Sequence, residues 1–209
     1  MPVLSQNYFK NVFINCPFDK EYFPIFYGII FAVYDCGFIP RCALETEDSG
    51  DVRINKIMDI IEECCYGIHD ISRVELSVAP SGNLPRFNMP LELGIFMGAQ
   101  RFGSRGKQKK NYIILDAEKY RYQQFISDLS GQDIKVHENQ IDKAILHTRN
   151  WLSTKNGGVL IPGGTEINRR YIEFRAILPE LSAEYHLNEA DLTFTDFCAL
   201  IESWFQKEE

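Results

Sequence analysis

One stretch sets the expected fold: Phe87-Asn-Met-Pro-Leu-Glu-Leu-Gly-Ile-Phe-Met-Gly-Ala-Gln100. Pro90 suits the first turn of a helix, because the N–H that proline lacks would have no partner there. Asn88 is a candidate N-terminal cap, and the apolar and small residues from Leu91 onward predict a helix that packs closely against a sheet. Glu92 is then either a structural acid at the start of a helix or a positioned carboxylate nucleophile at the edge of an α/β sheet, since the helix dipole stabilises a carboxylate there by roughly 0.3–1 kcal/mol.

Strand-like and helix-like segments alternate on both sides of this helix. Strands are expected at 10–15, 38–44, 66–72, 111–116 and 134–137. Helices are expected from Asp19 to Gly37 and at 53–65, 88–100, 119–129 and 140–152. Because Pro40 cannot donate to a sheet ladder, the second strand is placed near an edge. The alternation predicts an α/β fold, a parallel sheet of about five strands with helices on both faces.

The composition changes to Gly and small residues between 153 and 164, which marks the candidate domain boundary. The sequence therefore predicts an α/β domain at 1–155 and a C-terminal helical extension at 165–209. Two helices are expected in the extension, at 166–184 and 193–207, the second capped by Thr193 or Thr195. Their apolar faces must be buried either against the sheet domain or against a second copy of the protein.

Composition and charge exclude several classes of protein. With 209 residues, 45% of them hydrophobic, the chain can build one substantial core. A net charge of −7 disfavours binding to duplex nucleic acid. No signal peptide is visible in 1–11, and no apolar run is long enough to span a membrane, so a soluble cytoplasmic protein is expected. The six cysteines form no C-x-x-C pair, so neither a metal site nor a disulfide framework is expected.

Polar residues gather where the expected strands end, and ligands of open parallel α/β sheets bind outside those carboxyl ends. The candidate catalytic residues are Glu92 and Asp70. The other candidate site residues are Asn15, Pro17, Phe18, Asp48, Ser49, Arg53, His69, Arg73, Arg86 and Asn88. His69 is equally compatible with a structural strand histidine and with a catalytic one. The sequence contains no G-x-G-x-x-G, P-loop or G-x-S-x-G motif, which disfavours dinucleotide redox, P-loop and serine-hydrolase chemistry.

With these reaction classes disfavoured, the sequence favours catalysis by carboxylate side chains. Two carboxyl groups beside one glycosidic bond can divide the work of nucleophile and of acid or orienting group. Glu92 would attack the anomeric carbon, and Asp70 would bind the sugar hydroxyls or the departing base.

Three short motifs resemble the superfamily that joins nucleoside 2-deoxyribosyltransferases to Toll/interleukin-1-receptor-type (TIR) domains. They are Val12-Phe-Ile-Asn-Cys-Pro-Phe-Asp19, Gly67-Ile-His-Asp-Ile-Ser72 and Pro90-Leu-Glu-Leu-Gly-Ile-Phe-Met-Gly-Ala99. The resemblance covers roughly residues 10 to 150 and agrees in order and spacing. It implies a flavodoxin-like fold and cleavage or transfer at an N-glycosidic bond, with Glu92 as nucleophile, Asp70 as a substrate-binding acid and no cofactor.

The chain departs from the transferase pattern at Arg86, where the transferases usually carry an Asp. An arginine there suits a phosphorylated substrate, such as a nucleotide or NAD, because guanidinium matches phosphate bidentately. Members of the superfamily that act in bacterial antiphage defence cleave such substrates, and active sites completed by a neighbouring subunit are common in it, so a homo-oligomer is expected. A non-catalytic nucleotide sensor and a scaffold that assembles through its C-terminal helices are the alternatives.

Overall fold

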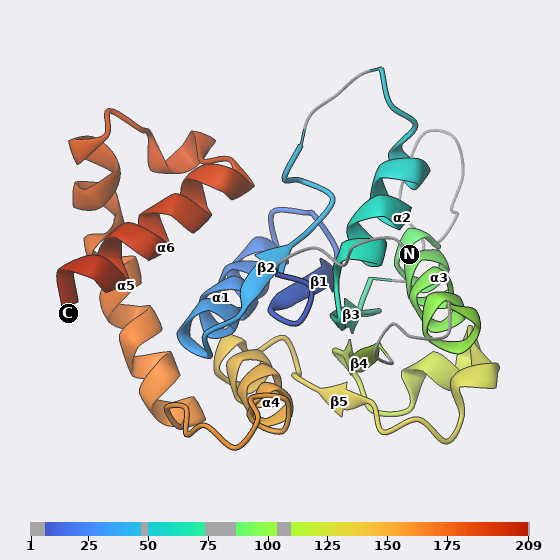
Figure 1. Ribbon diagram of the computed structural model, residues 1–209. Coiled ribbons are helices and arrows are strands. Elements are labelled where there is room, and N and C mark those ends of the chain that lie inside the picture. Colours follow the sequence, from blue (N-terminus) through green and yellow to red (C-terminus); the bar gives the residue numbers. More distant parts are fainter. Residues whose placement is uncertain (1–6, 47–49, 74–86, 104–109, 209) are drawn as a thin grey trace.

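The fold is a flavodoxin-like α/β structure built on an all-parallel sheet of five strands in the order β2-β1-β3-β4-β5 (Figure 1). The computed structural model describes residues 7–46, 50–73, 87–103 and 110–208. The strands are β1 (Asn11–Asn15), β2 (Ile39–Arg41), β3 (Tyr66–Asp70), β4 (Asn111–Asp116) and β5 (Lys135–Val136). All five lie within segments that the sequence pattern predicts, and β2, which holds Pro40, is an edge strand as expected.

Helices cover both faces of the sheet (Figure 1). The α-helices are α1 (Phe23–Asp35), α2 (Arg53–Glu63), α3 (Asn88–Phe102), α4 (Ile141–Ser153), α5 (Gly164–Glu184) and α6 (Phe194–Glu208). Helices α1 and α4 lie on one face, and α2 and α3 lie on the other. Within the described ranges, none of the helices combines the length and apolar character that a membrane crossing requires.

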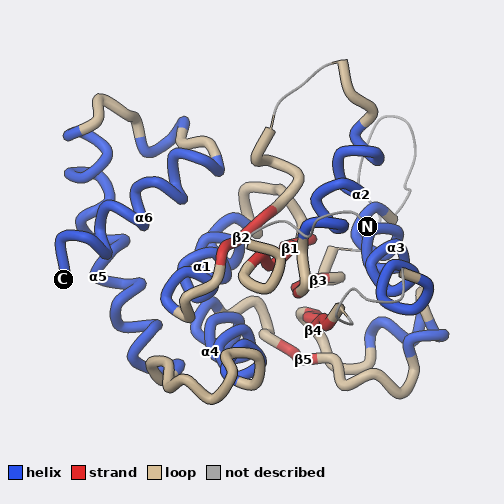
Figure 2. The backbone as a smooth tube through the Cα atoms, viewed as in Figure 1, coloured by secondary structure: helices blue, strands red, loops and turns tan. Residues whose placement is uncertain are grey.

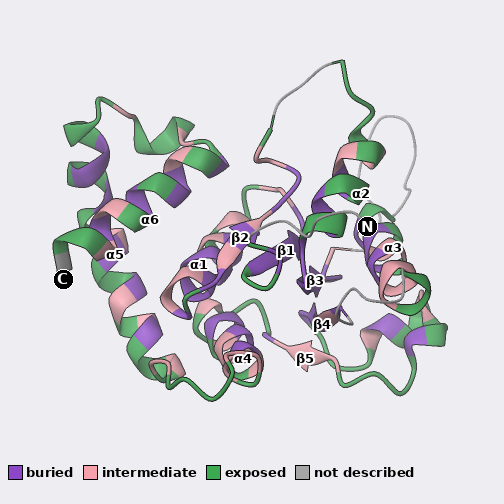
Figure 3. Cartoon of the chain, viewed as in Figure 1, coloured by how far each residue is buried: buried purple, intermediate pink, exposed green. Residues whose placement is uncertain are grey.

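The strand alternation divides the interior into cores on the two faces of the sheet (Figure 3). Successive side chains of a strand point to opposite faces, so Val12 and Ile14 of β1 pack with α1 and α4. Phe13, between them, packs instead with Ile57 of α2 and Phe96 of α3. The same alternation along β3 decides on which face each candidate site residue lies.

The two C-terminal helices are buried against the α/β domain. Phe174 of α5 and Trp204 of α6 pack against Phe31 of α1, with ring centroids 5.5 and 5.6 Å from it. Thr193 caps α6, as one of the two expected choices, because its Oγ1 accepts the N–H of Asp196 while the Asp196 carboxylate accepts the N–H of Thr193. Of the two partners that the sequence left open for these apolar faces, the structure shows the sheet domain.

Two local expectations are wrong. The segment at 119–129 forms two short 3-10 turns, η1 (Arg121–Gln124) and η2 (Ser127–Leu129), in place of an α-helix; Figure 2 draws these turns as short blue segments between β4 and β5. Asn88 does not cap α3: it is the first helical residue, and Phe87 occupies the cap position without a side-chain hydrogen bond. Pro90 does lie in the first turn, as expected.

Lys110, just before β4, closes the C-terminal end of α2. Its Nζ donates to the carbonyl oxygen of Ile61 at 2.7 Å and also to that of Cys64. The ammonium group also lies 5.0 and 5.6 Å from the ring centroids of Tyr8 and Phe96. The side chain is only 6% exposed, so it is a buried charged donor for carbonyl groups at the end of the helix.

Replacing Lys110 with Met is expected to lower the free energy of unfolding by about 2–3 kcal/mol, because buried acceptors lose a charged donor. Chemical denaturation at pH 7 measures the change. Lys207→Met is the matched control, since the Lys207–Glu184 ion pair is more than half exposed on both sides and is worth at most about 1 kcal/mol. Equal effects of the two substitutions would contradict this role of Lys110.

Candidate functional site

Helices α2 and α3 enclose a hollow of about 220 Å³ that contains three of the predicted site residues. Its lining consists of Arg53, Ile54, Ile57, Asn88, Leu91 and Glu92. Arg53 and Asn88 are the first residues of their helices, so the hollow lies at two helix N-termini, where the helix dipoles favour negative charge. The arrangement brings the Glu92 carboxyl group, the Arg53 guanidinium and the Asn88 amide together beside apolar side chains.

Glu92 is the chemically most perturbed group of this hollow. Its side chain is only 6% exposed, and burial raises the pKa of Glu92 to about 7, while the positive charge of Arg53 opposes the rise. A carboxyl group with such a pKa can exchange protons near neutral pH. Arg53 itself is exposed and forms no ion pair with any residue that the structure describes, so its guanidinium is available to an anionic ligand.

Asp70 lies on the opposite face of the sheet from Glu92. Tyr66 and Ile68 of β3 belong to the core beneath α1 and α4, and strand alternation places Asp70 on that same face. The carboxylate is fully buried, with Oδ2 2.9 Å from His137 Nε2 and Oδ1 accepting the N–H of Ser72 at 2.8 Å. The described residues therefore give no support to the expected cavity shared by Asp70 and Glu92.

The partners of Asp70 fix its charge state, and the contacts of His137 fix the tautomer of that ring. Burial by itself would raise the pKa of Asp70, but the hydrogen bonds from His137 and Ser72 outweigh it and hold the pKa below its usual value. Nδ1 of His137 accepts the N–H of Asn139 at 3.1 Å, so the proton of a neutral ring is on Nε2, toward Asp70. The Ser72 hydroxyl lies 2.9 Å from that same Nε2. Because Ser72 and Asp70 share one ring nitrogen, the three residues do not form a nucleophilic triad.

His69 is a core histidine in this structure. It is fully buried, and burial lowers the pKa of His69 to about 3, so the ring stays neutral near pH 7. It packs against Phe96 with a centroid distance of 4.9 Å, and a Cβ at Gly67 would lie 2.7 Å from its Nε2. Asn15 donates from Nδ2 to His69 Nδ1 at 3.1 Å and to the Met89 carbonyl at 2.8 Å. Both residues thus join β1, β3 and α3, and neither is exposed to a ligand.

The other predicted site residues lie apart from the hollow or outside the described ranges. Arg73 pairs with Asp19 at 3.3 Å and with Glu21 at 2.8 Å. Pro17 is buried, and Phe18 packs edge-to-face on Phe26 with centroids 5.4 Å apart. Asp48, Ser49 and Arg86 lie outside the residues that the structure describes.

Two polar residues near the carboxyl ends of the strands, the buried His137 and the half-buried Arg121, were missed by the sequence interpretation. His137 follows a strand of only two residues, and Arg121 donates to Asp116 Oδ1 at 2.6 Å and to the Ser72 carbonyl at 2.5 Å. Burial raises the pKa of Asp116, opposed by the charge of Arg121. A polar residue directly after an expected strand was the available signal for His137, whereas nothing local marks Arg121 as the partner of Asp116.

The fold and this site define a flavodoxin-like α/β protein with a buried carboxyl group at the N-termini of two helices. Comparison with protein-family models, with curated proteins and with solved structures finds no match for this chain. The resemblance to the deoxyribosyltransferase and TIR superfamily therefore rests on the sequence motifs.

Proposed function

We propose that this protein cleaves or transfers at the N-glycosidic bond of a nucleotide-type substrate (a nucleotide, NAD or a nucleoside), with Glu92 as the nucleophile. The observation that carries the proposal is the nearly buried carboxyl group of Glu92 in a hollow that also holds Arg53. A perturbed acid in a concave site is a functional candidate on physical grounds. Arg53 suits a phosphate group of the same substrate.

In the proposed reaction, a Glu92 carboxylate oxygen bonds to the anomeric carbon as the carbon–nitrogen bond breaks, and the bonding electrons leave with the base. Water or a second acceptor then attacks the glycosyl ester and restores the carboxylate. With Asp70 on the other face of the sheet, Glu92 is the single acid among the described residues that line the hollow. A base that is already cationic in the substrate, such as the nicotinamide of NAD, needs no protonation to leave, so a lone carboxylate favours that substrate type.

The alternative is a nucleotide sensor without turnover. The same observation supports it, because one carboxylate and one arginine are sufficient to bind ribose hydroxyls and phosphate. The described hollow of about 220 Å³ is also smaller than the roughly 300 Å³ at which small-molecule sites usually begin.

Incubation of the purified protein with NAD, NADP, nucleoside monophosphates and deoxynucleosides, followed by chromatography of the free base, tests the proposal. Release of a base supports an enzyme, and addition of a second base separates transfer from hydrolysis. Binding of a ligand without any release would instead identify the sensor, and neither release nor binding would contradict both functions.

Arg53→Ala is expected to weaken binding of a phosphorylated substrate about tenfold or more, because one charged hydrogen-bond donor is lost. The unphosphorylated nucleoside should bind almost equally to both forms. Calorimetry with the two ligands measures the difference. Arg169→Ala is the control, since Arg169 is an exposed arginine of α5 that pairs with Glu166 and Glu173. An equal loss for both ligands would exclude a phosphate contact by Arg53.

A homo-oligomer is part of the proposal. Phe87 and Leu91, next to the hollow, are 57% and 55% exposed, and Val52 beside α2 is 61% exposed. Apolar side chains around a partly enclosed site suit coverage by a neighbouring subunit. Sedimentation at several concentrations tests the assembly.

A further inference from the structure

A second hollow, of about 650 Å³, lies along the part of β4 that β5 leaves unpaired. Strand β5 pairs only with Leu115 and Asp116, so, within the described ranges, no strand pairs with Asn111 to Ile114 on the side of β4 opposite β3. Before Lys135 the chain turns on itself, because the Ile134 N–H bonds to the Gln132 carbonyl. The hollow is therefore an open sheet edge and not a gap between side chains alone.

Main-chain groups of β4 point into this opening. Asn111 N donates to the Cys65 carbonyl, and Leu115 O accepts from Ile71, so the odd-numbered residues of β4 direct their peptide groups toward β3. Asp116 O accepts from His137, so the even-numbered residues point the other way. Tyr112 consequently presents its N–H and its C=O to the open edge, and no hydrogen bond to either group occurs in the described part of the chain. Such an edge is a template for an added strand.

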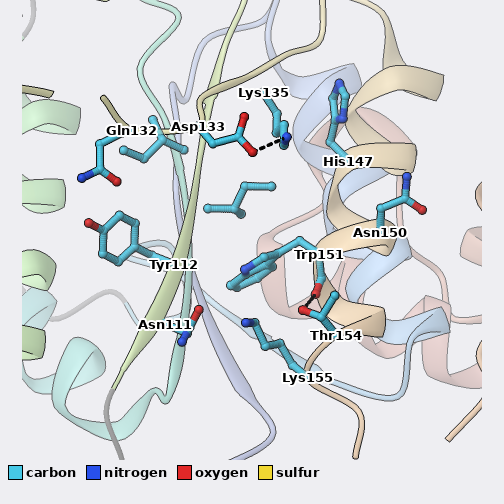
Figure 4. A pocket seen from close by; sticks show the side chains of 12 residues that line it. Asn111, Tyr112, Gln132, Asp133, Lys135, His147, Asn150, Trp151, Thr154 and Lys155 are labelled. Carbon is cyan, nitrogen blue, oxygen red and sulfur yellow. Dashed lines mark hydrogen bonds and ion pairs between the residues drawn. The ribbon is translucent and has the colours of Figure 1, made fainter. Parts of the chain in front are cut away.

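Side chains border the edge on both faces of the sheet (Figure 4). Trp151 of α4 and Lys155, in the turn just past the end of that helix, lie on one side, and Tyr112 and Gln132 lie on the other. A strand added here would place alternate side chains against these two walls. Side chains two apart on a strand are separated by roughly 6.6 Å, so an added strand can present two side chains to the wall that Trp151 and Lys155 form.

The charges of the groove favour an acidic side chain beside α4. Lys135 is paired with Asp133 at 2.6 Å, and burial lowers the pKa of His147, which keeps that ring neutral. Lys155 forms no ion pair with any residue in the described ranges, so it is the uncompensated cation of the groove. A carboxylate two positions from an apolar side chain would match Lys155 and Trp151 together.

We propose that β4 binds an extended segment of another polypeptide by strand addition, with an acidic residue against Lys155 and an apolar residue two positions away against Trp151. The main-chain hydrogen bonds to Tyr112 supply the affinity, and the two side-chain positions supply the specificity. This site is separate from the Glu92 hollow and does not depend on the function proposed for it.

Two capped heptapeptides, Thr-Glu-Thr-Val-Thr-Val-Thr and the same sequence in reverse order, are suitable probes, because they cover both strand directions. Amide hydrogen exchange by NMR is expected to show at least about tenfold slower exchange of the Tyr112 N–H when one of them is bound. Replacing Glu with Lys in the peptide should weaken binding by about fivefold or more, and Lys155→Glu should reverse that preference. Lys207→Glu, the same charge change on α6, should leave it unaltered.

Methylation of the peptide nitrogens gives the sharpest test. Methyl groups on the alternate amides that face β4 should abolish binding, whereas methyl groups on the intervening amides should not. Failure of both peptides to slow Tyr112 exchange at about 1 mM would overturn the proposal. Slowing that depends on protein concentration without peptide would assign the edge to a second copy of the chain, and slowing by a nucleotide would assign it to a small molecule; either result also overturns it.

Discussion

The Glu92→Gln variant loses release of the base by a factor on the order of 10³ or more, if Glu92 is the nucleophile, because an amide cannot form the glycosyl ester. Substrate affinity changes little, since Gln keeps the size and the hydrogen-bonding capacity of the side chain. Base release under saturating substrate and calorimetric binding, measured on the same preparation, separate the two effects. A variant that turns over at the unmodified rate would exclude Glu92 as nucleophile.

The pH dependence of this reaction follows from the same group. Only the deprotonated carboxylate attacks, and the pKa of Glu92 is raised to about 7 by burial, so kcat/KM should rise with pH through about 7. A bound cationic substrate stabilises the carboxylate, which should move the corresponding rise in kcat to lower pH. A flat profile between pH 5 and 8 would contradict the assignment.

The raised pKa of Glu92 also predicts that deprotonation of this carboxyl group lowers the free energy of unfolding. A carboxyl group whose folded pKa lies above its unfolded value of 4.5 favours the folded state less as pH rises through the interval between the two values. Glu92→Gln removes this cost, so the variant should be more stable than the unmodified protein at pH 8, by up to about 3 kcal/mol, and nearly equal to it at pH 4. Glu180→Gln, an exposed change on α5, is the control, and an equal effect at both pH values would contradict burial of the charge.

The sequence predicted the strands well, most clearly where a strand is a buried run, as β1 and β3 are. The run from Asn111 to Asp116 predicted β4, and Pro40 predicted the position of β2 at an edge. Apolar periodicity also predicted both C-terminal helices, but not their partner. Whether Phe174 and Trp204 meet α1 or a second chain depends on shape complementarity between distant segments, which periodicity does not contain.

The sequence pattern did not predict the directions of the side chains at the strand ends. Strand ends correctly located Asp70 at the carboxyl edge of the sheet, yet a shift of one residue moves a strand side chain to the opposite face. The side chain of Asp70 points to the same face of the sheet as that of Ile68, the face covered by α1. The side chain of His69 points to the other face, where Phe96 lies. The sequence placed Glu92 at the start of the helix, but the first turn of α3 holds no acid and Glu92 lies just beyond it, where it lines the hollow.

Asp70→Asn is expected to lower the free energy of unfolding by about 3 kcal/mol at pH 7, because the new amide NH2 group would face the buried N–H of His137 Nε2. Nδ1 of His137 accepts the N–H of Asn139, so the proton of the neutral ring is on Nε2. The single amide oxygen of the substituted side chain could accept from Nε2 of His137 or from the N–H of Ser72, but not from both in their present places. Chemical denaturation measures the loss. His137→Gln, which keeps one donor and one acceptor, should cost less than His137→Leu, which keeps neither.

Acid should remove the difference between Asp70→Asn and the unmodified protein. The pKa of Asp70 is held below its usual 3.8, so the stability that its charge contributes is complete above about pH 4 and is lost as pH falls through the folded pKa. KM and kcat of the folded fraction decide between a structural and a substrate-binding Asp70. Because the fully buried Asp70 carboxylate is held by His137 and Ser72, we expect unchanged values in a variant that unfolds easily. A large rise in KM with intact stability would instead assign Asp70 to the substrate and require the two carboxylates to share one cavity.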